Sequence, residues 1–265
     1  MAEDLVLTEV DARGVATVTL NRAEVHNALS HDVVGALRAA FDALAAREDV
    51  RATILAARGK SFSAGADLKR MRRAAGFTLE ENKADAVRTA GLFDALNTLP
   101  MPTIAKVHGS AYAGGIGLVA ACDIAVGAAH ALFAITEVKL GLIPAMISPY
   151  VTAAIGPKAA RRYCQTAERF DAAEAKRIGL LHEVVAADAL DAEVERIVGE
   201  ILKSAPESLR ACKTLIRDTV GPVSESLREE TASRIAAIRA SGEGKEGLAA
   251  FFEKRKPDWA RTEGG

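Results

Sequence analysis

The first part of the chain alternates between short β-branched runs and longer segments with apolar residues at helical spacing. Residues 4–10 and 15–21 predict two strands of a hairpin, because VATVTL is rich in β-branched residues and the intervening DARG supplies turn residues. Ser30 is a suitable N-cap for a helix that continues to Arg47. One face of this helix is expected to cover a sheet, since apolar residues recur at Val33, Val34, Leu37, Phe41 and Leu44.

Three further strands are predicted at residues 51–57, 103–109 and 124–128, with helical patterns between or after them. Strands that alternate with helices favour parallel sheets joined by crossovers. Towards the C-terminus the pattern becomes helical throughout. We therefore predict an α/β fold with two parts, a core over residues 1–200 and a helical region over residues 201–265.

The C-terminal helical region has predicted segments through residue 218, over 223–240 and over 244–256, and Pro206 suits a helix start. Helices in such a tail cannot bury their apolar faces alone. They are expected to pack on the core or on neighbouring subunits, which predicts a homo-oligomer.

Composition excludes several classes of function. The net charge is −1, with 34 Lys plus Arg against 35 Asp plus Glu and no clustered basic stretch, so nucleic acid is not an expected partner. No signal peptide is evident and no apolar run approaches the roughly 18 residues of a membrane span, which predicts a cytoplasmic protein with no membrane partner. The three cysteines lack C-x-x-C spacing, which predicts reduced, buried thiols rather than disulfides or a zinc site.

Two segments of small residues follow predicted strands, FSAGADL at 62–68 and GSAYAGGIG at 109–117. Small residues let a ligand approach main-chain N–H groups, and a helix beginning at Gly114 or Gly115 directs unpaired donors at an anion. Two such loops are able to converge on one oxygen atom. The alternative is a pair of turns with tight helix–strand packing, and neither loop alone excludes it.

Residues 115–120 also match the dinucleotide-binding pattern G-x-G-x-x-A, with Glu137 about twenty residues further on. The next predicted strand starts near Ile124, which leaves about seven residues for a crossover that needs a dozen or more. A Rossmann unit therefore does not fit. The sequence also lacks a G-x-S-x-G elbow and an H-E-x-x-H motif, and no histidine is assigned as an acid or base.

Glu137 lies between two apolar stretches, residues 131–135 and 138–144, so its side chain is expected near the interior. One interpretation is a salt bridge with Lys139 or a capping role. The other is a proton shuttle whose pKa is raised by burial. The pattern alone leaves both open.

Four segments in this order resemble motifs of the enoyl-CoA hydratase/isomerase, or crotonase, family: LNRAEVHNALS (20–30), FSAGADLKRM (62–71), HGSAYAGGIGLVAACDIAVGA (108–128) and FAITEVKLGLIP (133–144). The resemblance covers nearly the whole chain. It implies a spiral of β-β-α units forming two nearly perpendicular sheets, with C-terminal helices that support trimers or dimers of trimers. It also implies an acyl-CoA thioester substrate, and no cofactor or metal, because coenzyme A is part of the substrate.

The resemblance also implies the roles of particular residues. The backbone N–H groups of Ala66 and Gly114 would form an oxyanion hole for the thioester oxygen, and Glu137 would be the catalytic acid. The implied substrate-binding residues are Val25, His26, Ala64, Asp67, Leu68, Lys69, Gly115 and Gly117, together with Phe251 and Lys254 from a neighbouring subunit.

The chain departs from the family pattern at three places. Glu24 stands where many relatives carry a basic residue that meets the phosphates, which would shift that role to Lys69, Lys254 and Arg22. The first of the two glutamates of typical hydratases falls on glycine, at position 117. The segment PAMISPY (144–150) replaces a glycine-rich turn, which resembles hydratases of the methylglutaconyl-CoA and isohexenylglutaconyl-CoA type, used on branched acyl groups.

Because Glu137 is the one catalytic glutamate retained, three functions stay open. The leading interpretation is an enoyl-CoA hydratase that adds water to a 2-trans-enoyl thioester. The second is an isomerase, which moves one proton between C2 and C4 and needs a single base. The third is a CoA-binding or RNA-binding homologue whose catalysis has decayed.

Overall fold

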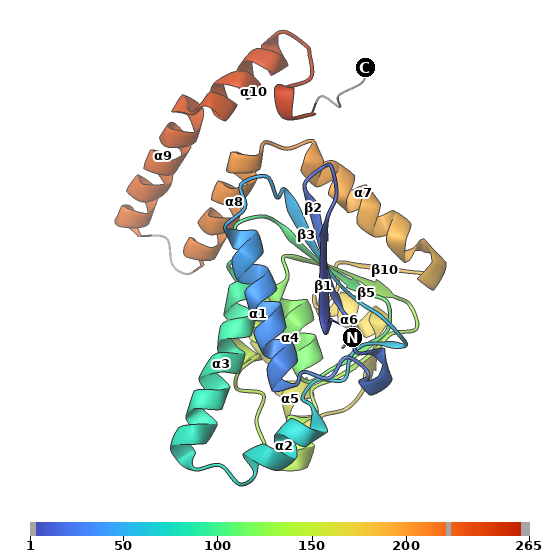
Figure 1. Ribbon diagram of the computed structural model, residues 1–265. Coiled ribbons are helices and arrows are strands. Elements are labelled where there is room, and N and C mark those ends of the chain that lie inside the picture. The colour runs from blue at the N-terminus through green and yellow to red at the C-terminus, as the bar shows by residue number, and fades with distance from the viewer. Residues whose placement is uncertain (1–3, 221–223, 261–265) are drawn as a thin grey trace.

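The computed structural model describes residues 4–220 and 224–260 of the chain. Two sheets form the centre of the fold, and helices cover them (Figure 1). The strands are β1 (Val6–Val10), β2 (Val15–Leu20), β3 (Ala52–Ala57), β4 (Ser61–Ser63), β5 (Thr103–Val107), β6 (Ser110–Tyr112), β7 (Ile124–Ala128), β8 (Leu132–Ala134), β9 (Phe170–Asp171) and β10 (Glu183–Val185).

The helices are interleaved with the strands along the chain. They are α1 (His31–Ala45), α2 (Leu68–Ala74), α3 (Leu79–Asn97), α4 (Gly114–Ala121), α5 (Ser148–Thr166), α6 (Ala172–Arg177), α7 (Leu190–Leu202), α8 (Pro206–Asp218), α9 (Glu225–Ala240) and α10 (Gly242–Phe252). Four short 3-10 helices are η1 (Ala23–Val25), η2 (Glu137–Leu140), η3 (Ala187–Ala189) and η4 (Asp258–Ala260).

After the opening hairpin, which lies wholly in the larger sheet, each turn of the chain supplies one strand to each sheet. The six-stranded sheet has the order β1-β2-β3-β5-β7-β10, and the four-stranded sheet has the order β4-β6-β8-β9. Thus β3 and β4, β5 and β6, and β7 and β8 are successive pairs that divide between the two sheets, and helices follow each pair. This is the β-β-α repeat that the resemblance implied. The opening hairpin is also confirmed, since β1 and β2 pair antiparallel, whereas every later pair in the larger sheet is parallel.

The larger sheet is buried on both faces, which explains why its inner strands read as continuous apolar runs. On one face lies the main core, to which α1, α3, α4 and α5 contribute (Figure 1). The Ser30 hydroxyl accepts the Val33 N–H at 3.3 Å, so the predicted N-cap is confirmed, and all five predicted apolar residues of α1 are buried. On the other face α7 packs through Val194 and Val198 against Ala52 and Val126.

The C-terminal helices α9 and α10 stand apart from the sheets, at the opposite end of the molecule from α2 (Figure 1). Arg51 ties this region to the core, because its guanidinium donates to the carbonyls of Leu202 (2.9 Å), Ser204 (2.8 Å) and Trp259 (3.1 Å). The Trp259 indole in turn donates to the Lys203 carbonyl. The chain therefore returns to the core after α10.

The prediction of buried thiols is wrong for Cys212, which is exposed because it lies on α8, a helix with no buried residue. Cys122 and Cys164 are partly buried, and all three thiols are free. In the described part of the chain, no helix is long and apolar enough to cross a membrane.

Candidate active site

The two segments of small residues lie against each other, backbone to backbone. Gly65 has a φ of +84°, and a Cβ at this position would lie 2.7 Å from the Tyr112 carbonyl oxygen and 3.3 Å from the Gly114 nitrogen. A Cβ on Gly115 would lie 2.6 Å from the Ser63 carbonyl oxygen. Glycine is required at both positions, since any side chain would separate the loops.

This contact brings the Ala66 and Gly114 N–H groups into one region. Gly114 is the first residue of α4, where an N–H has no acceptor within the helix. Ala113 before it holds a left-handed φ of 46°, a conformation that residues other than glycine adopt when the surroundings enforce it. Leu29 donates to the Gly65 carbonyl at 2.7 Å, and this bond fixes the loop beside Ala66. Among the described residues, neither the Ala66 nor the Gly114 N–H has an acceptor in the protein.

Glu137 follows β8 and is brought to the same loops by sheet pairing. Tyr112 pairs with Ala134, and the Ala113 N–H donates to the Ala134 carbonyl at 2.9 Å. Glu137 lies three residues after Ala134, at the start of η2. The residues proposed for the oxyanion hole and for acid–base chemistry therefore lie on adjacent strand ends.

The Glu137 carboxyl is half-buried, and burial raises its pKa, while bonds to its own backbone N–H and that of Thr136 act in the opposite direction. Its Oε2 atom is buried without a hydrogen-bond partner. Within residues 4–220 and 224–260 it forms no ion pair, so the structure does not support a salt bridge with Lys139. A half-buried carboxyl with an unsatisfied oxygen and a raised pKa is suited to proton transfer.

Gly117, where a typical hydratase has its first glutamate, has no space for a side chain. A Cβ here would lie 2.8 Å from Phe93 Cε1 and 2.9 Å from Ile147 Cβ, and still closer to Ile147 Cγ2. Phe93 and Ile147 were not identified from the sequence. The one available signal was that Ile147 lies in the segment that departs from the family pattern.

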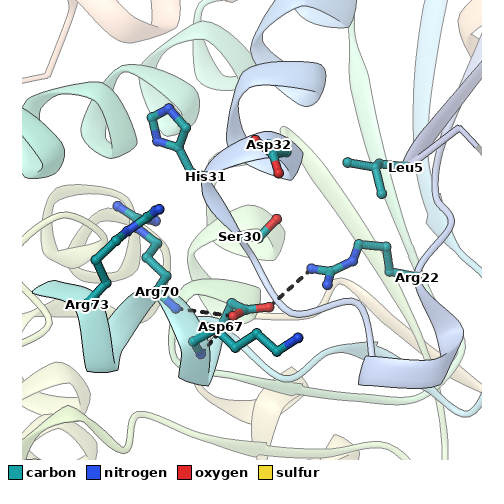
Figure 2. A pocket seen from close by; sticks show the side chains of 9 residues that line it. Leu5, Arg22, Ser30, His31, Asp32, Asp67, Arg70 and Arg73 are labelled. Carbon is teal, nitrogen blue, oxygen red and sulfur yellow. Dashed lines mark hydrogen bonds and ion pairs between the residues drawn. The ribbon is translucent and has the colours of Figure 1, made fainter. Parts of the chain in front are cut away.

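Asp67 ends the first loop and has a structural role. Its carboxylate accepts the Lys69 and Arg70 N–H groups at 2.9 and 3.2 Å and so caps α2, and it forms an ion pair with Arg22 at 3.2 Å (Figure 2). Arg22 also donates to the Ala28 carbonyl, and its side chain is 18% exposed. The expectation that Arg22 would be available for phosphates is therefore not supported, because its guanidinium is bound within the protein.

Lys69 borders a cavity of about 300 Å³ between the start of α1 and α2 (Figure 2). Arg70 on its wall is held by an ion pair with Asp85 of α3, which fixes α2 against α3. The cavity is mainly cationic, and its lining residues are Leu5, Arg22, Ser30, His31, Asp32, Asp67, Lys69, Arg70 and Arg73.

The other residues implied in binding differ in position. The Ala64 N–H donates to the His26 carbonyl at 2.8 Å, so these two backbone groups satisfy each other. Val25 and Leu68 are exposed beside them. Phe251 is 75% exposed on α10, and Lys254, which follows that helix, is also exposed; α10 stands apart from the sheets (Figure 1).

Comparison with known proteins shows the same architecture in solved structures. The family model for enoyl-CoA hydratase/isomerase matches residues 11–262. A crystal structure of an enoyl-CoA hydratase from Shewanella pealeana is 41% identical and superposes with a TM-score of 0.93, covering 97% of this chain and 96% of that one. An enoyl-CoA hydratase structure from Mycobacterium smegmatis is 39% identical, with a TM-score of 0.93 and coverages of 98% and 100%.

A curated protein of Mycobacterium bovis, "Probable enoyl-CoA hydratase echA8", is 37% identical over 98% of this chain and 99% of its own length. The family match, the two superpositions and this relative each extend over almost the entire sequence. The chain therefore has the crotonase fold and belongs to the enoyl-CoA hydratase/isomerase family of enzymes.

Proposed function

We propose that the protein is an enoyl-CoA hydratase that adds water across the C2=C3 bond of a 2-trans-enoyl-CoA. The observation that carries this proposal is that Ala66 and Gly114, whose N–H groups are unpaired, and the partly buried Glu137 follow three neighbouring strands, β4, β6 and β8. The N–H groups would bind the thioester oxygen more strongly as it gains negative charge, which lowers the barrier to enolate formation.

In the proposed reaction one carboxyl group serves both steps. The Glu137 carboxylate takes a proton from water as the water oxygen bonds to C3, and the C2=C3 π electrons move onto the thioester oxygen as an enolate. The protonated Glu137 then donates that proton to C2, which restores the thioester carbonyl. A pKa raised by burial suits both roles, because the carboxylate becomes a stronger base and its protonated form is favoured relative to an exposed glutamate.

The alternative with support of its own is an enoyl-CoA isomerase. Transfer of a proton between C2 and C4 needs one carboxyl group, and Gly117 leaves Glu137 as the one family glutamate. A homologue without catalysis would have little reason to keep a buried, unpaired carboxyl, because burying a charged group is costly.

We infer further that the acyl group is branched, of the methylglutaconyl type, a proposal supported by the PAMISPY segment at 144–150.

Reaction in heavy water distinguishes the two activities. Incubation of the wild-type enzyme with 2-trans-enoyl-CoA substrates, straight-chain and branched, is expected to give a 3-hydroxyacyl-CoA with deuterium at C2, which mass spectrometry measures. An unsaturated product with no added water would instead establish the isomerase. If none of these enoyl-CoA substrates were hydrated or isomerised, both proposed activities would be contradicted.

We propose that the protein assembles as a homotrimer or a dimer of trimers through its C-terminal helices. Light scattering at micromolar concentration is expected to give three or six times the monomer mass, because this region exposes apolar side chains that a partner would bury. A monomeric mass would overturn the proposal. The exposed side chains are Ile216, Ile235, Leu248, Phe251 and Phe252.

A further inference from the structure

Two departures from the family pattern that are thirty residues apart in sequence touch each other in the structure. One is Gly117 on α4, and the other is the segment 144–150, whose Ile147 precedes α5. Ile147 and Phe93 enclose the space beside Gly117, and both are buried, at 3% and 1% exposure. Neither side chain is free to move into solvent, so the absence of a glutamate and the presence of Ile147 depend on each other.

The same wall adjoins the proposed oxyanion hole. Gly114 and Gly117 are three residues apart on α4 and so face one side of the helix. A Cβ on Gly114 would lie 3.9 Å from Phe93 Cζ, and one on Gly117 would lie 2.8 Å from Phe93 Cε1. The Phe93 ring therefore spans both glycines, and Ile147 extends this apolar surface.

Ile147 also anchors the segment that carries Glu137. Of the residues from Glu137 to Ile147, Ile147 is the one that is buried, whereas Leu142, Ile143 and Met146 are exposed. The Leu142 N–H donates to the Glu137 carbonyl at 3.1 Å, which closes the turn at its other end. The pairing of β8 holds the segment before Glu137, so loss of the Ile147 anchor would free the other end of the segment and widen the range of positions open to the carboxyl group.

We propose that Ile147 is a positioning residue that occupies the volume of the missing first glutamate and holds Glu137 in place as the single acid–base group. This inference rests on the proposed function for its catalytic part, while its packing part stands on the contacts alone. In this interpretation an apolar anchor replaces the carboxyl group of the first glutamate, and the replacement is not a sign of lost catalysis.

A double-mutant cycle tests the packing part. Gly117→Ala should lower Tm by about 3–10 °C, because a methyl group cannot fit beside Ile147 and Phe93. Ile147→Gly should also lower Tm, but the double variant should be more stable than the sum of the two losses predicts, since each change relieves the other. Gly199→Ala is the matched control, because no atom lies within 4 Å of a Cβ at that helical position. Additive losses would overturn the proposal.

The pH dependence of kcat/KM tests the positioning part. Ile147→Gly should reduce turnover about 10- to 100-fold through displacement of Glu137. It should also move the acid-side inflection to lower pH, because a released Glu137 is more hydrated and loses the cause of its raised pKa. If Ile147→Gly lowered Tm but left the acid-side inflection of kcat/KM unchanged, the proposal that Ile147 positions Glu137 would be overturned. A wild-type enzyme that hydrates no enoyl-CoA would refute the proposed function instead, and the Tm cycle would still test the contact.

Discussion

Glu137→Gln is expected to reduce the hydration rate by about 100- to 10,000-fold. Glutamine keeps the shape and hydrogen-bonding capacity of the side chain but neither accepts the proton of water nor donates one to C2. Burial already raises the pKa of the Glu137 carboxyl, so the amide, which is uncharged, should be accommodated without loss of stability. Steady-state kinetics on the substrate that the wild-type enzyme hydrates best measures the effect.

Coenzyme A binding separates this loss from misfolding. The variant should gain the same thermal stabilisation from millimolar CoA as the wild type, because the nucleotide is expected to contact the 64–69 loop and not Glu137. Glu9→Gln, at an exposed position on β1, is the matched control and should leave the rate unchanged. Full hydratase activity of Glu137→Gln would remove this residue from the mechanism.

Gly114→Val is expected to lower kcat by about 100- to 1000-fold, because the valine side chain should keep the thioester oxygen from the Gly114 N–H, and losing one oxyanion donor usually has an effect of this size. A Cβ at this position would lie 3.0 Å from Leu29 Cδ1 and 3.9 Å from the Gly65 Cα. The flexible Leu29 side chain is able to yield to one carbon atom. The two valine methyl groups would in addition enter the space between the loops, where the thioester oxygen is proposed to bind.

The measurement compares kcat with CoA protection in the same preparation. Stabilisation by CoA should persist while turnover is lost. Gly35→Val is the control for placing valine in a helix, because a Cβ on Gly35 meets no atom within 4 Å, and it should keep its activity. If Gly114→Val turned over at the wild-type rate, the assignment of its N–H to the oxyanion hole would be wrong.

Elements with a full period of apolar residues could be predicted from the sequence. The hairpin, the helix capped by Ser30 and the strand at 124–128 all lie where the pattern placed them. The strands of the smaller sheet were missed because all four have three residues or fewer, which is too short for a period-2 pattern to emerge. Two of them, β4 and β6, adjoin the glycine-containing loops and were interpreted as part of them.

The candidate site was predicted in part for the same kind of reason. Glu137 was identified because a carboxylate interrupts an apolar stretch, and that signal is local. The ion pair that holds Arg22 joins it to Asp67, 45 residues away, and the Gly117–Ile147 contact joins α4 to the residue that precedes α5. Such contacts depend on how distant segments pack, and no spacing rule in the sequence encodes them.

The hydrogen bonds of Arg51 affect the order in which parts of the protein unfold. The hydrogen bond from Arg51 to the Trp259 carbonyl joins residues 208 positions apart, so forming it in the unfolded chain costs more entropy than forming a local contact. It should therefore be among the last contacts to form and the first to break. Amide hydrogens of residues 242–260 that no neighbouring subunit covers should exchange with solvent before those of the inner strands, through partial detachment of the C-terminal end while both sheets stay intact.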